Sequence, residues 1–213
     1  MNSERTPELK HLTRTRIPTK YGEFELFLYC DPANGKEHLA MVRGKVENQK
    51  GVLVRVHSEC LTGDVFGSLR CDCGQQLQTS LKRIAQEGAG VLVYLRQEGR
   101  GIGLVNKMKA YNLQDEGFDT VEANLMLGHK ADERSYEMAA GILKDLNVQS
   151  VRLLSNNPHK MAALQQAHIE VVERLALQPQ ANAENIKYLR TKIQKLNHSF
   201  ELDDEINDEM SKS

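Results

Sequence analysis

LQTSLKRIAQEGAGVLVYLRQEGRGIGL, residues 77–104, decides the fold class. Apolar residues at helical spacing predict a helix in its first part, and Gly88 ends that helix. The run VLVYL, residues 91–95, is typical of a buried strand, and the glycine-rich turn at 96–103 leads into a second helix near 104–116. A buried strand between two helices indicates a helix-covered sheet with parallel strands.

Further strands and helices are expected on both sides of this stretch. Asn34-Gly35 is a strong hairpin signal. The expected strands lie near residues 24–28, 39–46, 52–56, 151–154 and 169–172, and the further helices lie near 132–146, after residue 157 and over 186–196. We therefore predict an α/β (mixed α+β) protein: a single domain with a mixed sheet flanked by helices and a β-rich N-terminal part.

Charge is unevenly spread along the 213 residues. Residues 201–213 hold six acids and one lysine, which leaves a formal charge of +4 on the rest of the chain against −1 overall. A mildly basic body suits a small anionic substrate, but it is too weak to indicate nucleic-acid binding. We expect a flexible N-terminus over 1–12, one folded domain over 13–200 and a disordered acidic tail over 201–213.

The sequence has no apolar run near the roughly 20 residues of a membrane span. Its polar first ten residues lack the apolar core of a signal peptide. Both observations predict a cytoplasmic protein with no membrane partner. In that compartment the four cysteines are expected to be thiols or metal ligands rather than disulfides.

Three of the cysteines, Cys60, Cys71 and Cys73, follow the spacing C-x10-C-x-C. Three thiolates can hold one Zn²⁺ and leave its fourth tetrahedral position for water, which is the arrangement of a catalytic metal. The spacing leaves two other interpretations open. Cys30 could close a structural four-cysteine site, or the three cysteines could be ordinary buried thiols.

Three shorter motifs carry charged residues at turns. RQEGRGIGL, residues 96–104, and SNNPHK, residues 155–160, each join a strand to a helix, where backbone N–H groups and cationic side chains could bind phosphate. ADERSY, residues 131–136, places Asp132 and Arg134 at an expected helix start. Each motif alone also has an ordinary explanation: a tight turn with solvated arginines, a helix cap with a solvated lysine, or acidic capping.

Together the motifs closely resemble the GTP cyclohydrolase II family, over about residues 15–200. The segments that carry the resemblance, in the family's order, are RVHSECLTGD (55–64), SLRCDCG (68–74), RQEGRGIGL (96–104), KAYNLQD (109–115), DTVEAN (119–124) and RLLSNNP (152–158). The resemblance implies that the folded part is a GTP cyclohydrolase II-like catalytic domain.

The activity that the resemblance implies is zinc-dependent opening of the imidazole ring of GTP. Formate and pyrophosphate are released, and 2,5-diamino-6-(5-phosphoribosylamino)pyrimidin-4(3H)-one is formed, in the first step of riboflavin biosynthesis. The three cysteines would hold one Zn²⁺ per chain, Mg²⁺ would accompany the triphosphate, and the protein would be a homodimer.

The resemblance also implies roles for single residues. Its motifs assign catalysis to Asp132, Arg134 and Tyr111, and nucleotide binding to Arg55, Val56, His57, Ser58, Glu59, Gln76, Glu98, Gly99, Arg100, Thr120, Ser155 and Lys160. Arg134 could be a covalent nucleophile or a stabiliser of charge on the transferring phosphoryl group. Ser155 stands for the family's usual threonine, Ser135 for an acid and His129 for an aromatic residue, and the last two border the catalytic pair.

Two other functions stay open on the sequence. A non-catalytic zinc module for RNA or DNA would need a basic stripe with interleaved aromatic residues, and the aromatic content of 5% argues against it. A paralogue could keep the zinc-dependent hydrolysis but act on another base or stop at a formylated product.

Overall fold

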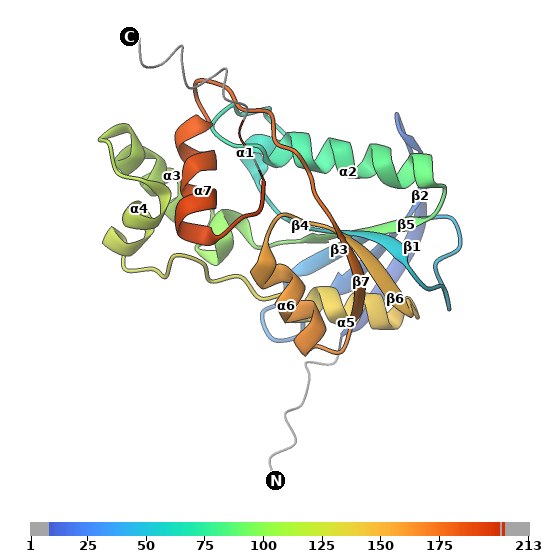
Figure 1. Ribbon diagram of the computed structural model, residues 1–213. Helices are drawn as coiled ribbons and strands as arrows, with labels where there is room; N and C mark the ends of the chain where they lie inside the picture. Colours follow the sequence, from blue (N-terminus) through green and yellow to red (C-terminus); the bar gives the residue numbers. More distant parts are fainter. Residues whose placement is uncertain (1–8, 201, 203–213) are drawn as a thin grey trace.

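The computed structural model describes residues 9–200 and residue 202 (Figure 1). The strands are β1 (Lys10–Thr19), β2 (Gly22–Cys30), β3 (Glu37–Arg43), β4 (Val52–Ser58), β5 (Gly90–Leu95), β6 (Ser150–Leu154) and β7 (Glu170–Leu175). The helices are α1 (Leu61–Asp64), α2 (Cys73–Glu87), the 3-10 helix η1 (Glu98–Gly101), α3 (Gly103–Asp115), α4 (Thr120–Met126), α5 (Glu137–Asp145), α6 (Pro158–Gln166) and α7 (Ile186–Leu196).

The strands form one mixed sheet in the order β1-β2-β3-β5-β4-β6-β7. β1, β2, β3 and β5 pair antiparallel, whereas β5, β4, β6 and β7 pair parallel. The predicted mixed sheet with a β-rich N-terminal part is therefore confirmed. The Asn34-Gly35 hairpin is also confirmed, because β2 and β3 pair antiparallel across it, with Cys30 opposite Glu37.

Helices cover both faces of the sheet: α2 lies on one face, and α5 and α6 lie on the other (Figure 1). Residues of β4 point alternately to these two layers. Val54 and Val56 belong to the larger core cluster with Ile142 of α5, whereas Leu53 packs in a second cluster with Ile84 of α2. The alternation puts Arg55 and His57, two polar residues of β4, on the α2 side.

The parallel strands create a switch point at β4, because β5 and β6 lie on opposite sides of it. The chain leaves β4 towards one neighbour and later returns to the other, so the loops after these strands diverge and leave a crevice at their carboxyl ends. α3, α4 and α7 gather beyond this end of the sheet, at the left of Figure 1.

One predicted helix begins later than expected, and one helix was not predicted. The helix predicted over 132–146 begins only at Glu137, because the Asp132 side chain accepts hydrogen bonds from the backbone and side chain of Arg134 and holds a local turn instead. α4 was not predicted, although the Asp119 side chain and Glu122 form a capping box at its start.

The predicted flexible N-terminus, residues 1–12, is wrong for residues 10–12, which belong to β1. β1 is an edge strand that pairs only with β2, and most of its residues are exposed, so it has no apolar alternation to reveal it. Residues 1–8 and the predicted tail, apart from residue 202, lie outside the described part of the chain. None of the described helices combines the length and apolar character of a membrane span.

Candidate active site

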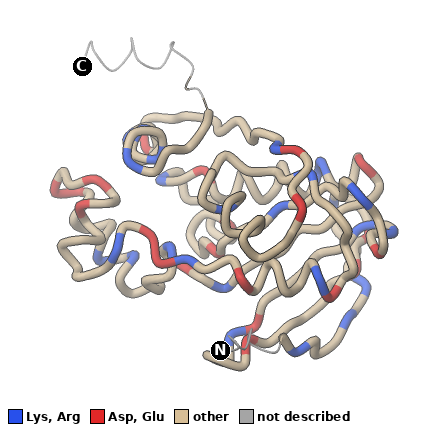
Figure 2. Tube along the Cα trace, turned by 60° about the horizontal axis from the view of Figure 1, so that its bottom comes forward, with Lys and Arg blue, Asp and Glu red and all other residues tan. Residues whose placement is uncertain are grey.

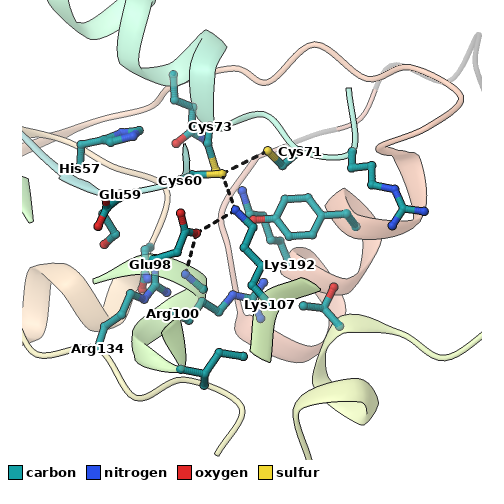
Figure 3. A pocket seen from close by; sticks show the side chains of 18 of the residues that line it. His57, Glu59, Cys60, Cys71, Cys73, Glu98, Arg100, Lys107, Arg134 and Lys192 are labelled. Atoms are coloured by element: carbon teal, nitrogen blue, oxygen red, sulfur yellow. Dashed lines mark hydrogen bonds and ion pairs between the residues drawn. The ribbon is translucent and has the colours of Figure 1, made fainter. Parts of the chain in front are cut away.

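A cavity opens at the carboxyl ends of the parallel strands (Figure 3). It encloses about 1020 Å³, counting the part open to solvent, which is in the range of small-molecule sites. The predicted residues that line it are Arg55, His57, Ser58, Glu59, Cys60, Cys71, Cys73, Gln76, Glu98, Gly99, Arg100, Tyr111, Thr120, Arg134, Ser155 and Lys160. Residues more than 100 positions apart in the sequence, such as Arg55 and Lys160, thus meet in one site.

Two of the predicted site residues, Val56 and Asp132, are not part of the cavity lining. The Val56 side chain is buried in the core, while its backbone oxygen accepts a hydrogen bond from Lys160 Nζ at 2.6 Å. Asp132 accepts from Arg134 Nε at 2.8 Å. Val56 therefore acts on a ligand through Lys160, and Asp132 acts through Arg134.

The thiols of Cys60, Cys71 and Cys73 converge, with their sulfur atoms all within 4.8 Å of one another. Two glycines allow this approach. A Cβ atom on Gly74 would lie 2.1 Å from the backbone oxygen of Gly63, and one on Gly63 would lie 2.9 Å from Cys71 Sγ. α1 and the start of α2 therefore pack backbone to backbone, and this brings the three thiols together.

The three thiols fit a zinc ion. Tetrahedral zinc with Zn–S bonds of about 2.3 Å needs sulfur atoms roughly 3.8 Å apart, and Cys60 Sγ lies 3.6 Å from Cys71 Sγ. Cys30 lies in β2 and does not belong to the cluster found among the described residues. The geometry therefore favours a three-thiolate site over a closed site with Cys30 as fourth ligand.

The charge state of the thiols also suits a cation. Hydrogen bonds from the Cys71 and Cys73 thiols, and then the charge of Lys107, lower the pKa of Cys60. Hydrogen bonding to Cys60 raises the pKa of Cys71 to about 11. One negative charge is thus already favoured in the cluster without metal, and a metal ion would stabilise the others.

Lys107 and Glu98 form a buried ion pair beside the thiols, with 2.8 Å between Nζ and Oε1 (Figure 3). Lys107 Nζ also lies 3.1 Å from Cys60 Sγ. Glu98 accepts a further hydrogen bond from Leu61 N at 2.7 Å. Sequence reasoning missed Lys107, although its i, i+4 spacing to Tyr111 places both on one face of α3.

Asp64 fixes the other side of the cysteine loop. It accepts hydrogen bonds from Cys60 N at 3.0 Å and Tyr94 Oη at 2.9 Å, and it lies 3.0 Å from His57 Nε2. Burial lowers the pKa of His57 despite the carboxylate. A neutral His57 is consistent with an orienting role in this network.

A group of cations lies away from the thiols. Lys160 is only 4% exposed, and burial, together with the charges of Arg55 and Arg134, lowers its pKa well below the usual value. The terminal nitrogens of Arg100 are buried and have no hydrogen-bond partner among the described residues. The alternative of solvated cations is therefore wrong for Arg100 and Lys160. Buried cations without an ion-pair partner among the described residues favour an anionic ligand.

Asp132 and Arg134 form a two-pronged ion pair, through Arg134 Nε and Nη2. Burial opposes the charge on Arg134, but Tyr136 and the Asp132 carboxylate outweigh it and raise the pKa of the guanidinium. Burial likewise opposes the charge on Asp132, and the bonds from Arg134 lower its pKa. Both partners are therefore held in their charged forms.

Sequence reasoning also missed several lining residues: Ile102, Ala110, Gln114, Asn124, Asn156, Asn157, Tyr188, Lys192 and His198. Asn157 caps α6, because its side-chain oxygen accepts a hydrogen bond from Lys160 N at 3.3 Å. The sequence signal for this cap is an asparagine directly before a proline, a combination typical of a helix start.

Comparison with known proteins gives a family match over most of the chain. The family model described as GTP cyclohydrolase II matches residues 10–176. The chain is 59% identical over 186 residues to the riboflavin biosynthesis protein RibBA of Bacillus cereus, covering 87% of this chain and 47% of that protein. It is 54% identical over 193 residues to a riboflavin biosynthesis protein of Vibrio vulnificus, covering 91% and 53%.

The chain thus spans about half the length of the curated relatives that it matches. A solved structure of RibBX from A. baumannii, a two-domain 3,4-dihydroxy-2-butanone 4-phosphate synthase, matches with a TM-score of 0.47 and 23% identity, over 84% of this chain and 43% of that one. That likeness adds nothing to the assignment.

The metal site is tested by exchanging single cysteines for serine. Cys71→Ser should lose zinc, because two thiolates and a hydroxyl bind the ion far more weakly than three thiolates. Cys30→Ser is the matched control and should keep one zinc per chain. The measurement is zinc content of the purified variants by elemental analysis. Loss of zinc from Cys30→Ser would contradict the three-thiolate site.

Proposed function

Because the chain belongs to the GTP cyclohydrolase II family, we propose that it is a zinc-dependent hydrolase that opens the imidazole ring of GTP. It releases formate and pyrophosphate and forms 2,5-diamino-6-(5-phosphoribosylamino)pyrimidin-4(3H)-one, the first step of riboflavin biosynthesis. The observation that carries this proposal is the meeting of a three-thiol cluster and a group of buried cations in one cavity.

The thiol end of the cavity suits hydrolysis at carbon C8 of guanine. Zinc held by Cys60, Cys71 and Cys73 would lower the pKa of a water molecule towards neutrality and so supply the attacking hydroxide. Lys107 offsets part of the negative charge of the thiolates, since its ammonium lies 3.1 Å from Cys60 Sγ. Glu98 in turn holds Lys107 in place.

Two water molecules are consumed at C8. The first opens the ring and leaves a formamide, and the second splits the formamide into formate and a free amine. Tyr111 is suited to orient water and relay a proton for these steps, because its hydroxyl lies 3.4 Å from Thr62 Oγ1 near the thiols. Burial raises the pKa of Tyr111, so the phenol stays protonated and can donate.

The cationic end of the cavity suits the triphosphate. Arg100 offers unpaired N–H donors, Lys160 lies at the start of α6, and Ser155 offers a hydroxyl. These groups would bind phosphate oxygens directly, and Mg²⁺ would accompany the triphosphate. Lys160 has no ion-pair partner among the described residues beyond the weaker influence of the Asp132 charge, and a phosphate group beside it would favour its charged form.

For Arg134 we propose charge stabilisation rather than nucleophilic attack. A nucleophilic guanidine must first lose a proton, and the ion pair with Asp132 makes that loss harder. A charged guanidinium held by a carboxylate can instead neutralise charge on the α-phosphoryl group while a third water molecule attacks the phosphorus and pyrophosphate leaves. Asp132 then acts by holding Arg134 in place.

The alternative of a zinc module for nucleic acid has less support. Figure 2 shows Lys and Arg interleaved with Asp and Glu along the described chain, and the unpaired cations line a cavity rather than an open stripe. A paralogue that stops at a formylated product would use the same residues, so only the product separates it from our proposal. The homodimer stays a prediction.

The products formed from GTP test the proposed function. The zinc-loaded wild-type protein should release one formate per GTP consumed and yield the diaminopyrimidinone nucleotide, because the cavity holds three thiols that could bind a hydrolytic metal and a hydroxyl donor near them. Formate is measured enzymatically and the nucleotide by mass spectrometry. A formylated nucleotide without formate would replace the proposal by the paralogue.

Tyr111→Phe tests the second hydrolysis separately. The ring still packs, so GTP binding should stay within about twofold, whereas formate release should slow by roughly tenfold or more because the phenolic donor is lost. The ratio of formate released to GTP consumed reports the effect. Tyr21→Phe, near the β1–β2 turn, is the control. Unchanged formate release in Tyr111→Phe would rule out this role.

Arg134→Ala should abolish pyrophosphate release while zinc stays bound, since charge at phosphorus is no longer neutralised. Pyrophosphate and zinc are measured on the same sample, and Arg14→Ala, an exposed arginine of β1, is the control. Mass spectrometry of rapidly quenched wild type should show no GMP adduct on Arg134. An adduct would establish the nucleophile, and normal activity of Arg134→Ala would exclude both roles.

A further inference from the structure

Helix α7 and the residues after it form one wall of the cavity. Tyr188, Lys192 and His198 line it, yet all three lie beyond residue 176, where the match to the family model ends. In Figure 1 this helix lies with α3 and α4 beyond the end of the sheet, and α7 contacts α4. The cavity is therefore incomplete without a segment that lies beyond the match to the family model.

α7 is anchored firmly against the rest of the site. Ile186 and Leu189 are fully buried on its inner face. Lys192 Nζ forms a buried ion pair with Asp72 at 2.5 Å. Asp72 lies between Cys71 and Cys73 in the sequence. After the helix, Ser199 N donates to the backbone oxygen of Asn156 at 3.0 Å. These contacts hold α7 against the cavity.

The Tyr188 ring contacts two cations. Arg100 lies over its ring with the guanidinium carbon 5.7 Å from the ring centroid, and Lys192 Nζ lies 4.5 Å from it. Both distances are within the range of cation–π attraction. The ring face attracts the guanidinium of Arg100 but does not accept hydrogen bonds from its N–H groups. Those N–H groups can therefore donate to a ligand.

Arg100 and Arg134 are held in different ways. Two nitrogens of Arg134 donate hydrogen bonds to the Asp132 carboxylate. The carboxylate also offsets the positive charge of Arg134. Arg100 keeps both terminal nitrogens buried and without a hydrogen-bond partner among the described residues. A guanidinium whose terminal N–H groups make no hydrogen bond within the protein is well suited to bind the oxygens of a phosphate chain.

We propose that Tyr188 is a positioning residue for phosphate binding: its ring holds the Arg100 guanidinium at the cavity wall with the N–H donors free for the phosphate groups of the substrate. α7 is then part of the substrate site and not only a covering helix. The identity of the ligand as a nucleoside triphosphate rests on the proposed function, whereas the link between Tyr188 and Arg100 does not.

The test compares Tyr188→Leu, which removes the ring face, with Tyr188→Phe, which keeps it. Lys187→Ala, which removes an exposed cation from α7, is the matched control. The probe is inorganic tripolyphosphate, whose affinity is measured by calorimetry on the zinc-loaded full chain. KM and kcat for GTP, zinc content and thermal unfolding are measured on the same samples.

We expect Tyr188→Leu to bind tripolyphosphate roughly five- to thirtyfold more weakly, the range that a cation–π contact supplies. KM for GTP should rise by a similar factor with kcat within about twofold, and Tyr188→Phe and Lys187→Ala should behave as wild type. A merely structural role would lower the unfolding temperature and leave the affinity of the folded protein unchanged.

Wild-type affinity for tripolyphosphate in folded Tyr188→Leu would overturn the inference. If that variant does not fold, Tyr188→Met replaces it, because the flexible thioether fills similar space without a ring. Failure of the proposed function looks different, since wild type would then leave GTP intact or convert it to a formylated nucleotide without releasing formate. Weakened tripolyphosphate binding in Tyr188→Leu would still support the link between Tyr188 and Arg100.

Discussion

Glu98 holds the two ends of the cavity together. One carboxylate oxygen accepts from Leu61 N at 2.7 Å, at the start of the cysteine loop, and the other accepts from Gly99 N at 2.8 Å, in the turn that carries Arg100. The same oxygen pairs with Lys107. A carboxylate this buried is costly unless each oxygen is paired, so the three contacts constrain one another. The thiol end and the phosphate end therefore cannot shift independently.

The turn after β5 adds backbone strain at the same place. Gly99, Arg100 and Gly101 all have positive φ angles, of 62°, 60° and 99°. Glycine accepts this conformation freely, but Arg100 has a Cβ atom and is held there at a cost of about 1–2 kcal/mol. A hydrogen bond from Glu133 N to the backbone oxygen of Arg100, at 3.0 Å, helps to hold it. This backbone conformation directs the Arg100 side chain at the cavity before any ligand binds.

The sequence predicted the parts of the structure that local patterns encode. The buried strand of residues 91–95, the glycine that ends α2 and the cysteine spacing each depend on neighbours in the chain, so the mixed sheet and the thiol cluster were predictable. β1 was missed because an exposed edge strand needs no apolar face. Lys107 and Tyr188 were missed for another reason: each becomes informative only through a partner far away in sequence, Cys60 for the first and Arg100 for the second. Tertiary contacts of that kind leave no local signal.

The account depends most on an open three-thiolate metal centre facing the cavity. X-ray absorption spectroscopy at the zinc edge of the purified protein tests this directly, because it counts the ligand atoms by type. Our account predicts three sulfur ligands at about 2.3 Å and one lighter atom, oxygen or nitrogen, at about 2.0–2.1 Å. Four sulfur ligands would mean a closed structural site, and a shell of nitrogen and oxygen alone would mean that Cys60, Cys71 and Cys73 do not hold the metal.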